Sequence, residues 1–323
     1  MRKVILSEDT KKDILENLLK RSPNSYGKFE ASVAAILADV KEKGDEAVFD
    51  YTKRFDGADI NTANIIVTKE EIDEAYSHVD KQLVDVIRKA LVNIREYHAK
   101  QKQYSWFDST PNGTILGQKV TPLNRVGVYV PGGKAAYPSS VLMNIIPAKV
   151  AGVSQIIMTT PPGKDGRVNP GTLVAANEAG VDVIYKVGGA QAIAAMAYGT
   201  DSIRKVDKIV GPGNIYVALA KKAVYGHVSI DSIAGPSEIL VIADETANPR
   251  YVAADLLSQA EHDEMASAIL ITTSEELADK VSKEIDSFVA ELSRSEIISK
   301  SLENYGYILI ARDIDEAVET ANE

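Results

Sequence analysis

Three polar side chains in the second half of the sequence have the types and spacing that could form part of a metal site: Ser237, Gln259 and His262. Gln259 and His262 are three residues apart at the end of an amphipathic segment, so on a helix they share one face. Neutral imidazole is the commonest metal ligand in proteins, whereas an amide oxygen on zinc is uncommon. These residues predict part of a zinc site beside the loop hydroxyl of Ser237. Spacing alone favours the plainer alternative, in which Gln259 and His262 are ordinary polar groups of a helix and Ser237 is a turn residue.

Three glycine-rich turns directly follow apolar runs that are typical of buried strands. They are Tyr129-Val130-Pro131-Gly132-Gly133, Val187-Gly188-Gly189-Ala190-Gln191 and Gly211-Pro212-Gly213-Asn214. Ligands of an open parallel sheet bind at the carboxyl ends of its strands, where such turns converge. Glycine lets a ligand approach the backbone, and the helix start that follows favours phosphate. None of the turns is a G-x-G-x-x-G fingerprint, and each alone is typical of a tight strand-to-helix connection. Together they predict an unusual dinucleotide site contacted by Tyr129, Gln191 and Asn214.

Composition narrows the classes of protein that the chain can belong to. The 323 residues are 45% hydrophobic and 25% charged, which is typical of a globular protein with about two domains. The net charge of −10 argues against nucleic acid as a partner, since that binding rests on cationic groups. The chain has no cysteine, which excludes disulfides, thiolate metal sites and a cysteine nucleophile. No apolar run approaches the ~18 residues of a membrane span, and the N-terminus lacks a secretory signal pattern. We therefore expect a cytoplasmic protein that does not enter a membrane.

From residue 125 onward, short apolar runs alternate with helical segments, which indicates βαβ units and mostly parallel sheets. The expected helices begin near Ser139, Pro170, Ala190 and Asn214, and the pair Lys221-Lys222 is typical of a solvated helix face. A hairpin is expected around Asn112-Gly113 and a short strand at 65–67. The expected strands are 126–130, 156–159, 183–187, 208–210, 239–243, 268–272 and 307–311.

The same patterns suggest how the chain divides into domains. Residues 1–23 predict an N-terminal helical arm, whose apolar face must be covered by the body or by another subunit. Residues 24–125 and 236–323 are expected to form a first, discontinuous α/β domain, because helices before 125 need a sheet to cover. Residues 126–235 are expected to form a second α/β domain, inserted in the first, that carries the nucleotide-binding turns.

Beyond these patterns, the chain resembles the histidinol dehydrogenase family. The resemblance is strongest over residues 230–262, IDSIAGPSEILVIADETANPRYVAADLLSQAEH. The stretches VTPLNRVGVYVPGGKAAYPSSVLMN, KVGGAQAIAAMAYGT and KIVGPGNIYVALAKK are also similar to that family in order and spacing, so the likeness covers essentially the whole chain. It implies two Rossmann-like parallel-sheet domains of the aldehyde-dehydrogenase type, with the second inserted in the first.

The resemblance implies a zinc-dependent homodimer that performs the last step of histidine biosynthesis. It oxidises L-histidinol through the aldehyde to L-histidine and reduces two NAD⁺. Gln259 and His262 then match two of the family's four zinc ligands, and together with Ser237 they match residues that contact the substrate. Tyr129, Gln191 and Asn214 match the residues that contact NAD. The absence of cysteine is consistent with this reaction. Aldehyde oxidation through a covalent thiohemiacetal needs a cysteine, whereas the family's route to the acid does not.

The resemblance also implies functional groups that residues 1–323 do not contain. The family's Glu-His pair for proton transfer and its other two zinc ligands, an Asp and a His, match no position before Glu323. We therefore expect no catalytic base within this chain, an incomplete zinc site and an inactive, C-terminally truncated polypeptide. Two alternatives remain: a non-catalytic nucleotide-binding module, and a relative that acts on another amino alcohol.

Overall fold

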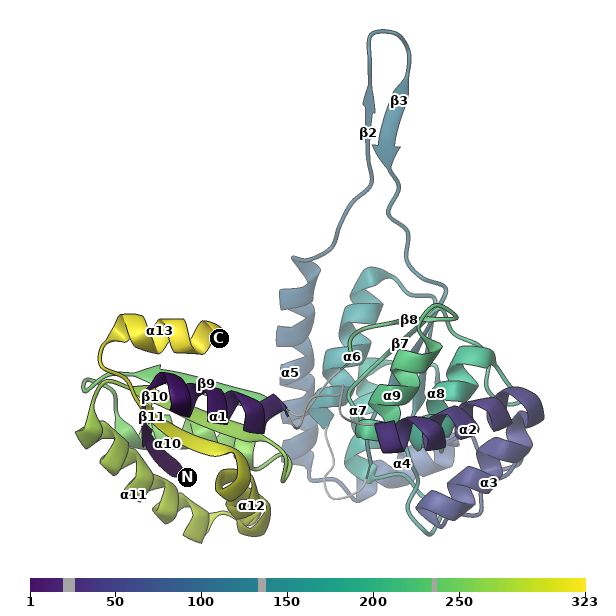
Figure 1. The fold of residues 1–323 in the computed structure, drawn as a ribbon. Coiled ribbons are helices and arrows are strands. Elements are labelled where there is room, and N and C mark those ends of the chain that lie inside the picture. Colours follow the sequence, from purple (N-terminus) through teal and green to yellow (C-terminus); the bar gives the residue numbers. More distant parts are fainter. Residues whose placement is uncertain (20–26, 133–137, 234–236) are drawn as a thin grey trace. The chain divides into compact units, whose positions relative to one another are not determined.

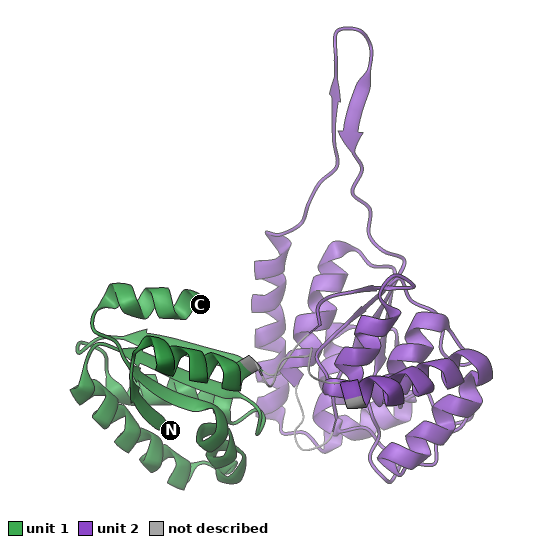
Figure 2. Ribbon diagram, in the orientation of Figure 1, with its two compact units in different colours: residues 1–26, 234–323 green, residues 27–233 purple. Residues whose placement is uncertain are grey.

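The computed structural model describes residues 1–19, 27–132, 138–233 and 237–323. The chain separates into two compact units, of which unit 1 comprises residues 1–26 and 234–323 and unit 2 comprises residues 27–233 (Figure 2). Both are α/β structures built on parallel sheets, as the sequence predicts. Among the described helices, none has the length and apolar character needed to cross a membrane.

Unit 2 is built on a five-stranded parallel sheet of order β6-β5-β4-β7-β8. The first strand, β4, is therefore central, and the chain winds outward from it in both directions. This is a doubly wound topology whose strand order reverses between β4 and β7, the point where such sheets bind ligands. The strands are β4 (Arg125–Tyr129), β5 (Gln155–Thr159), β6 (Val183–Tyr185), β7 (Lys208–Val210) and β8 (Ser229–Ile230).

Helices cover the sheet of unit 2 in more than one layer (Figure 1). The crossover helices are α6 (Pro138–Ala151), α7 (Pro170–Ala179), α8 (Gly189–Tyr198) and α9 (Ile215–Val224). The chain before the sheet forms α2 (Gly27–Lys43), α3 (Asp45–Asp56), α4 (Lys69–Ser77) and α5 (Lys81–Ala99). Helices α4 and α5 pack on α6 and α7, whereas α2 packs on α8 and α9 and α3 packs on α8.

This packing differs from the expected domain assignment. Helices α2 to α5 do not cover the sheet of residues 239–310 but belong to unit 2, where Val84 and Ile87 of α5 share a core with Ile145 and Ile146 of α6. The physical reason is that the crossover helices are apolar around much of their circumference, and a helix of this kind needs cover on its outer face as well. The expected strand at 65–67 forms only an isolated bridge between Ile66 and Tyr185.

A long hairpin extends from unit 2 beyond α5 (Figure 1). Its antiparallel strands are β2 (Trp106–Ser109) and β3 (Ile115–Gln118), joined through Asn112-Gly113 as predicted. Gly113 has φ +84°, and the Asn112 Oδ1 accepts from the Thr114 N–H. Trp106, Phe107, Ile115 and Leu116 are each more than half exposed, so apolar side chains face solvent on both sides of the hairpin.

Unit 1 contains a four-stranded parallel sheet of order β1-β11-β10-β9. One face packs on α10 (Pro249–Ala260), α11 (Glu275–Glu291) and α12 (Ser295–Tyr305), and the other on α1 (Glu8–Leu19) and α13 (Ile314–Asn322). The strands are β1 (Arg2–Ile5), β9 (Glu238–Ala243), β10 (Ser267–Thr272) and β11 (Gly306–Ile310).

The N-terminal segment packs on the body of its own chain, which is one of the two expected covers for its apolar face. Strand β1, which the sequence pattern missed, pairs with β11, and Ile14 and Leu18 of α1 pack into the core of unit 1 itself. Strand β1 lies at the sheet edge and is mostly exposed, so it lacks the alternation that identifies a half-buried strand. The expected end of the N-terminal arm, at residue 23, lies outside the described residues.

Candidate functional site

Tyr129 ends the central strand of unit 2, next to the point where the strand order reverses. Its side chain is 3% exposed, and its hydroxyl oxygen accepts a hydrogen bond from the Gly189 N–H at 3.2 Å. Burial raises the pKa of Tyr129 to about 12, an effect that the Gly189 hydrogen bond reduces. The phenol is therefore neutral at physiological pH, with its own proton available to donate.

Gln191 lies in the first turn of α8 and is 1% exposed. Both the oxygen and the nitrogen of its side-chain amide are buried, and neither has a hydrogen-bond partner among the residues that the structure describes. The amide folds over Gly189, where φ is +65° and a Cβ would lie 2.5 Å from the Gln191 Oε1. A buried amide without partners costs free energy, so this arrangement indicates a ligand that supplies them.

Asn214 is the N-cap of α9, and its Oδ1 accepts from the backbone N–H groups of Tyr216 and Val217. Asparagine is a favoured residue at this position because it satisfies N–H groups that the helix itself leaves unpaired. The role is structural, and it leaves the side-chain NH₂ for a ligand. Asn214 also lines the cleft described below.

A buried ion pair holds the turn that leads to Asn214. The Lys221 ammonium pairs with the Asp231 carboxylate and donates to the Gly211 carbonyl at 2.9 Å, while Asp231 accepts from the Gly211 N–H at 2.8 Å. Gly211 has φ +116°, and a Cβ there would collide with the Tyr129 carbonyl oxygen. Lys221 is 2% exposed, so its assignment to a solvated helix face is wrong. Neighbouring Lys222 is exposed. The two lysines look alike in the local sequence, because the partner that buries Lys221, Asp231, lies ten residues further along the chain.

Tyr129, Gln191 and Asn214 line one cleft of about 910 Å³, at the carboxyl ends of the strands of unit 2. The turns after β4, β5, β6 and β7 all contribute to it, as the rule for parallel sheets predicts. The N-termini of α8 and α9 also reach it, which suits a ligand with phosphate groups. The cleft has the size for a dinucleotide, and the unpaired amide of Gln191 fits one. Gly133, part of the first turn, lies outside the described residues.

Helices α2 and α3 complete the cleft with residues that the sequence patterns did not single out. Arg54, Phe55 and Asp56 come from the end of α3, and Lys164 from the loop after β5. The Asp56 Oδ2 is buried and, within the described part of the chain, has no hydrogen-bond partner. No motif marks these positions, because only the packing of α2 and α3 on α8 brings them to the strand ends.

In unit 1, Ser237, Gln259 and His262 lie at one end of the sheet. Strands β9 and β10 are parallel neighbours, so α10, which joins them, ends at the amino end where both strands begin. Ser237 precedes β9, and its carbonyl accepts from the N–H of Ser267, the first residue of β10. The His262 N–H donates to the Gln259 carbonyl at 3.1 Å, which continues the helical turn past the end of α10. Gln259 is partly buried, whereas Ser237 and His262 are exposed.

Imidazole and amide donors fit zinc, but Gln259 and His262 supply only two of the four ligands of a closed tetrahedral site. Among the described residues, no group of three or more His, Cys, Asp and Glu side chains could hold a metal ion. The turn Gly235-Pro236 before Ser237 lies outside the described residues.

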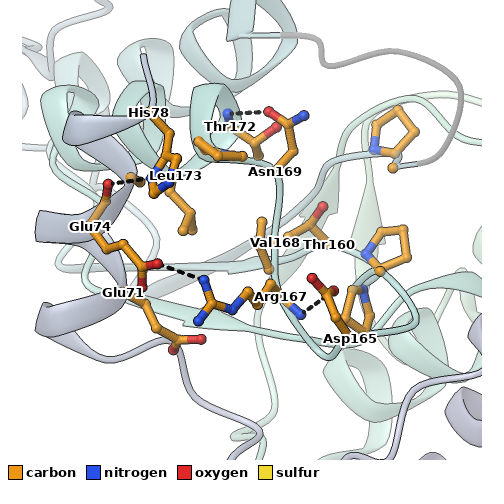
Figure 3. Close-up of a pocket in the computed structure, with 17 residues that line it drawn as sticks. Glu71, Glu74, His78, Thr160, Asp165, Arg167, Val168, Asn169, Thr172 and Leu173 are labelled. Carbon is orange, nitrogen blue, oxygen red and sulfur yellow. Dashed lines mark hydrogen bonds and ion pairs between the residues drawn. The ribbon is translucent and has the colours of Figure 1, made fainter.

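A second pocket, of about 420 Å³, lies in unit 2 between α4 and the loop that precedes α7 (Figure 3). Its charged side chains already have partners. Glu74 pairs with Arg167 at 2.6 Å and Glu71 with Lys186 at 2.5 Å, and Asp165 accepts from the Arg167 N–H. The His78 Nδ1 lies 2.9 Å from the Glu74 carbonyl oxygen. These pairs join α4 to the sheet, so we regard the pocket as structural.

Comparisons with known proteins give one consistent result. A model of the family described as histidinol dehydrogenase matches residues 19–323. The chain is 58% identical over 307 residues to histidinol dehydrogenase from Heliobacterium mobile, which is 95% of this chain and 72% of that protein. It is 59% identical over 291 residues to the one from Bacillus subtilis (strain 168), covering 90% of this chain and 68% of that protein. The crystal structure of histidinol dehydrogenase from Elizabethkingia anophelis matches with a TM-score of 0.91 and 38% identity, covering 100% of this chain and 73% of that one.

Proposed function

This chain belongs to the histidinol dehydrogenase family, and from that membership we propose that it carries the NAD-binding site and part of the zinc and substrate site of an enzyme that oxidises L-histidinol. The proposed reaction passes through L-histidinal to L-histidine with two NAD⁺, the last step of histidine biosynthesis in the cytoplasm. NAD supplies the hydride acceptor.

The observation that carries the proposal is the Gln191 amide, buried in the cleft without a partner among the described residues. A bound dinucleotide offers both donors and acceptors to such a group. The Tyr129 hydroxyl, already held by the Gly189 N–H, donates its proton to the same ligand. The Asn214 amide NH₂ and the N-termini of α8 and α9 hold the pyrophosphate.

In unit 1, we propose that Gln259 and His262 bind zinc and contact L-histidinol, together with Ser237. Zinc supplies Lewis-acid polarisation and orientation of the substrate. The two residues lie one helical turn apart, so they approach an ion from the same side. We place the other two ligands and the general base outside residues 1–323. This polypeptide then binds NAD but does not turn over L-histidinol.

Binding of NAD⁺ to residues 1–323, measured by isothermal titration calorimetry, tests the proposal. We expect saturable binding, weakened at least about tenfold by Gln191→Met, which keeps the volume but removes both hydrogen-bonding atoms. Gln82→Met, an exposed position of α5, is the matched control. Equal affinity in the wild type and Gln191→Met would contradict the assignment of the cleft. Turnover of another amino alcohol in place of L-histidinol would favour a relative with a different substrate.

We further propose that the protein is a homodimer. A two-stranded hairpin alone is marginally stable in water, and β2 and β3 expose Trp106, Phe107, Ile115 and Leu116. This supports association of copies through the hairpin. Sedimentation equilibrium checks it: Phe107→Ser should raise the dimer dissociation constant, whereas Tyr251→Ser, another exposed aromatic, should not. A monomeric wild type across the micromolar range would refute the proposal.

A further inference from the structure

Asp56 occupies a position that costs stability in the absence of a ligand. It is the last residue of α3, where the negative end of the helix dipole disfavours a carboxylate. Its Oδ2 is buried and unpartnered among the described residues, and burial raises the pKa of Asp56 to about 6. No salt bridge to a described residue compensates it. Asp56 nevertheless lines the cleft of unit 2, close enough to Tyr129 to raise the pKa of that phenol further.

Beside Asp56, α3 presents an aromatic surface to the same cleft. Phe55 is 53% exposed and stacks on Tyr51, with ring centroids 5.6 Å apart and an interplanar angle of 16°. The Tyr51 hydroxyl donates to the Asp39 Oδ2 at 2.6 Å, and this hydrogen bond fixes the position of the Tyr51 ring. The Phe55 ring therefore has Tyr51 against one face and is still more than half exposed. A supported and partly exposed ring suits the flat face of a purine base.

Two cations border this surface. Lys164 lies over Gly57, the left-handed C-cap of α3, where a Cβ would be 3.4 Å from the Lys164 Cγ. The Arg54 guanidinium lies 5.5 Å from the centre of the Phe55 ring. Both residues line the cleft. An aromatic ring, a carboxylate and two cations are together the kinds of group that bind the base, the ribose and the phosphates of a nucleotide.

In doubly wound dinucleotide-binding folds, an acid near the end of the second strand usually accepts from the ribose hydroxyls. Here the second strand, β5, is followed by Thr160-Pro161-Pro162-Gly163, which contains no acid. The next carboxylate, Asp165, accepts from the Arg167 N–H and lines the other pocket instead. The usual carboxylate is therefore missing from the strand, and Asp56 brings one to the cleft from α3.

We propose that Phe55 and Asp56 form the adenosine subsite of the cleft, with adenine stacked on Phe55 and the ribose hydroxyls donating to the Asp56 carboxylate, which selects NAD over NADP. The proposal rests on the proposed NAD-binding function and adds the residues that bind its adenosine half. A 2′-phosphate would remove the donor and place a second negative charge against Asp56, so discrimination follows from charge as well as from hydrogen bonding.

Calorimetry on residues 1–323 with NAD⁺, NADP⁺ and ADP-ribose, and displacement of NADH by nicotinamide mononucleotide, separates the two halves of the site. We expect Asp56→Asn to weaken the binding of NAD⁺ and of ADP-ribose about tenfold or more and to leave the binding of the mononucleotide unchanged. The difference in affinity between NAD⁺ and NADP⁺ should become smaller. Asp50→Asn removes the same charge from an exposed position of α3, and we expect it to leave the affinity for each of these ligands unchanged.

Phe55→Leu keeps an apolar side chain but loses the aromatic ring. We expect it to weaken the binding of ADP-ribose by about fivefold or more, because the stacking is lost.

The outcomes distinguish this inference from the proposed function. If the wild type binds NAD⁺ and Asp56→Asn binds it equally well, the adenosine assignment is wrong while the NAD site stands. If Asp56→Asn weakens the binding of nicotinamide mononucleotide as much as that of NAD⁺, Asp56 lies at the nicotinamide half, and the adenosine assignment is again wrong. A wild type that binds no NAD⁺ would refute both. Circular dichroism melting of each variant shows whether a loss of binding reflects a loss of fold.

Discussion

At the scale of single residues, the cleft is marked by polar groups that are left without partners. Gln191→Met should raise the stability of the ligand-free protein by about 1–2 kcal/mol, because it removes two buried and unsatisfied amide atoms. Urea unfolding followed by circular dichroism measures the change, with Gln82→Met as the neutral control. A destabilised Gln191→Met variant would show that the amide has partners in the free protein.

Asp56 should make stability depend on pH in a predictable direction. Its pKa is raised from 3.8 to about 6 in the folded state, so the unfolded chain loses this proton first as pH rises. The folded state is therefore penalised progressively from about pH 4 to 6 and fully above that range. Asp56→Asn should match the wild type below pH 4 and exceed it by about 1 kcal/mol at pH 8, after allowance for partial exposure. Melting curves at the two pH values check this, and an equal difference at both would contradict it.

At the scale of elements, the turn between β7 and α9 depends on the buried pair of Lys221 and Asp231. Lys221→Met should destabilise unit 2 by about 3 kcal/mol or more, since it leaves Asp231 and the Gly211 carbonyl without their cation. Lys222→Met makes the same change one residue away, at an exposed pair with Glu30, and should cost less than about 1 kcal/mol. Similar melting temperatures for the two variants would show that the pair does not hold the turn.

At the scale of the whole molecule, two donors on one helical turn are too few to hold zinc tightly. After dialysis against metal-free buffer and addition of one equivalent of zinc, residues 1–323 should retain much less than one zinc per chain. Production of NADH from L-histidinol should also be undetectable. Atomic absorption and absorbance at 340 nm are the measurements. One firmly bound zinc that His262→Ala releases would refute this expectation and require further ligands from residues 1–323 or from a second copy.

Much of the fold follows from local pattern. The strands from β4 onward begin and end within a few residues of their predicted positions, except for the short β8, which the pattern missed. Asn112-Gly113 forms the predicted hairpin, and Asp80 and Asp313 act as N-caps of α5 and α13, as is typical of aspartate. The convergence of Tyr129, Gln191 and Asn214 on one cleft also followed, because parallel strands present their carboxyl ends at one edge. The family resemblance is confirmed by the match over residues 19–323.

The partners of each helix and the burial of individual side chains depend on tertiary packing and could not be predicted from the sequence. An amphipathic pattern shows that α2 to α5 have an apolar face, but it carries no information about which sheet or helix covers that face. Strand β1 is recognisable as a strand only through its ladder with β11, and Ile14 is buried only because that sheet lies beneath it. The burial of Lys221 depends on Asp231, and the presence of Asp56 in the cleft depends on the docking of α3 against α8. Local sequence specifies backbone conformation and polarity, whereas contacts between distant segments specify the partners, burial and pKa of each side chain.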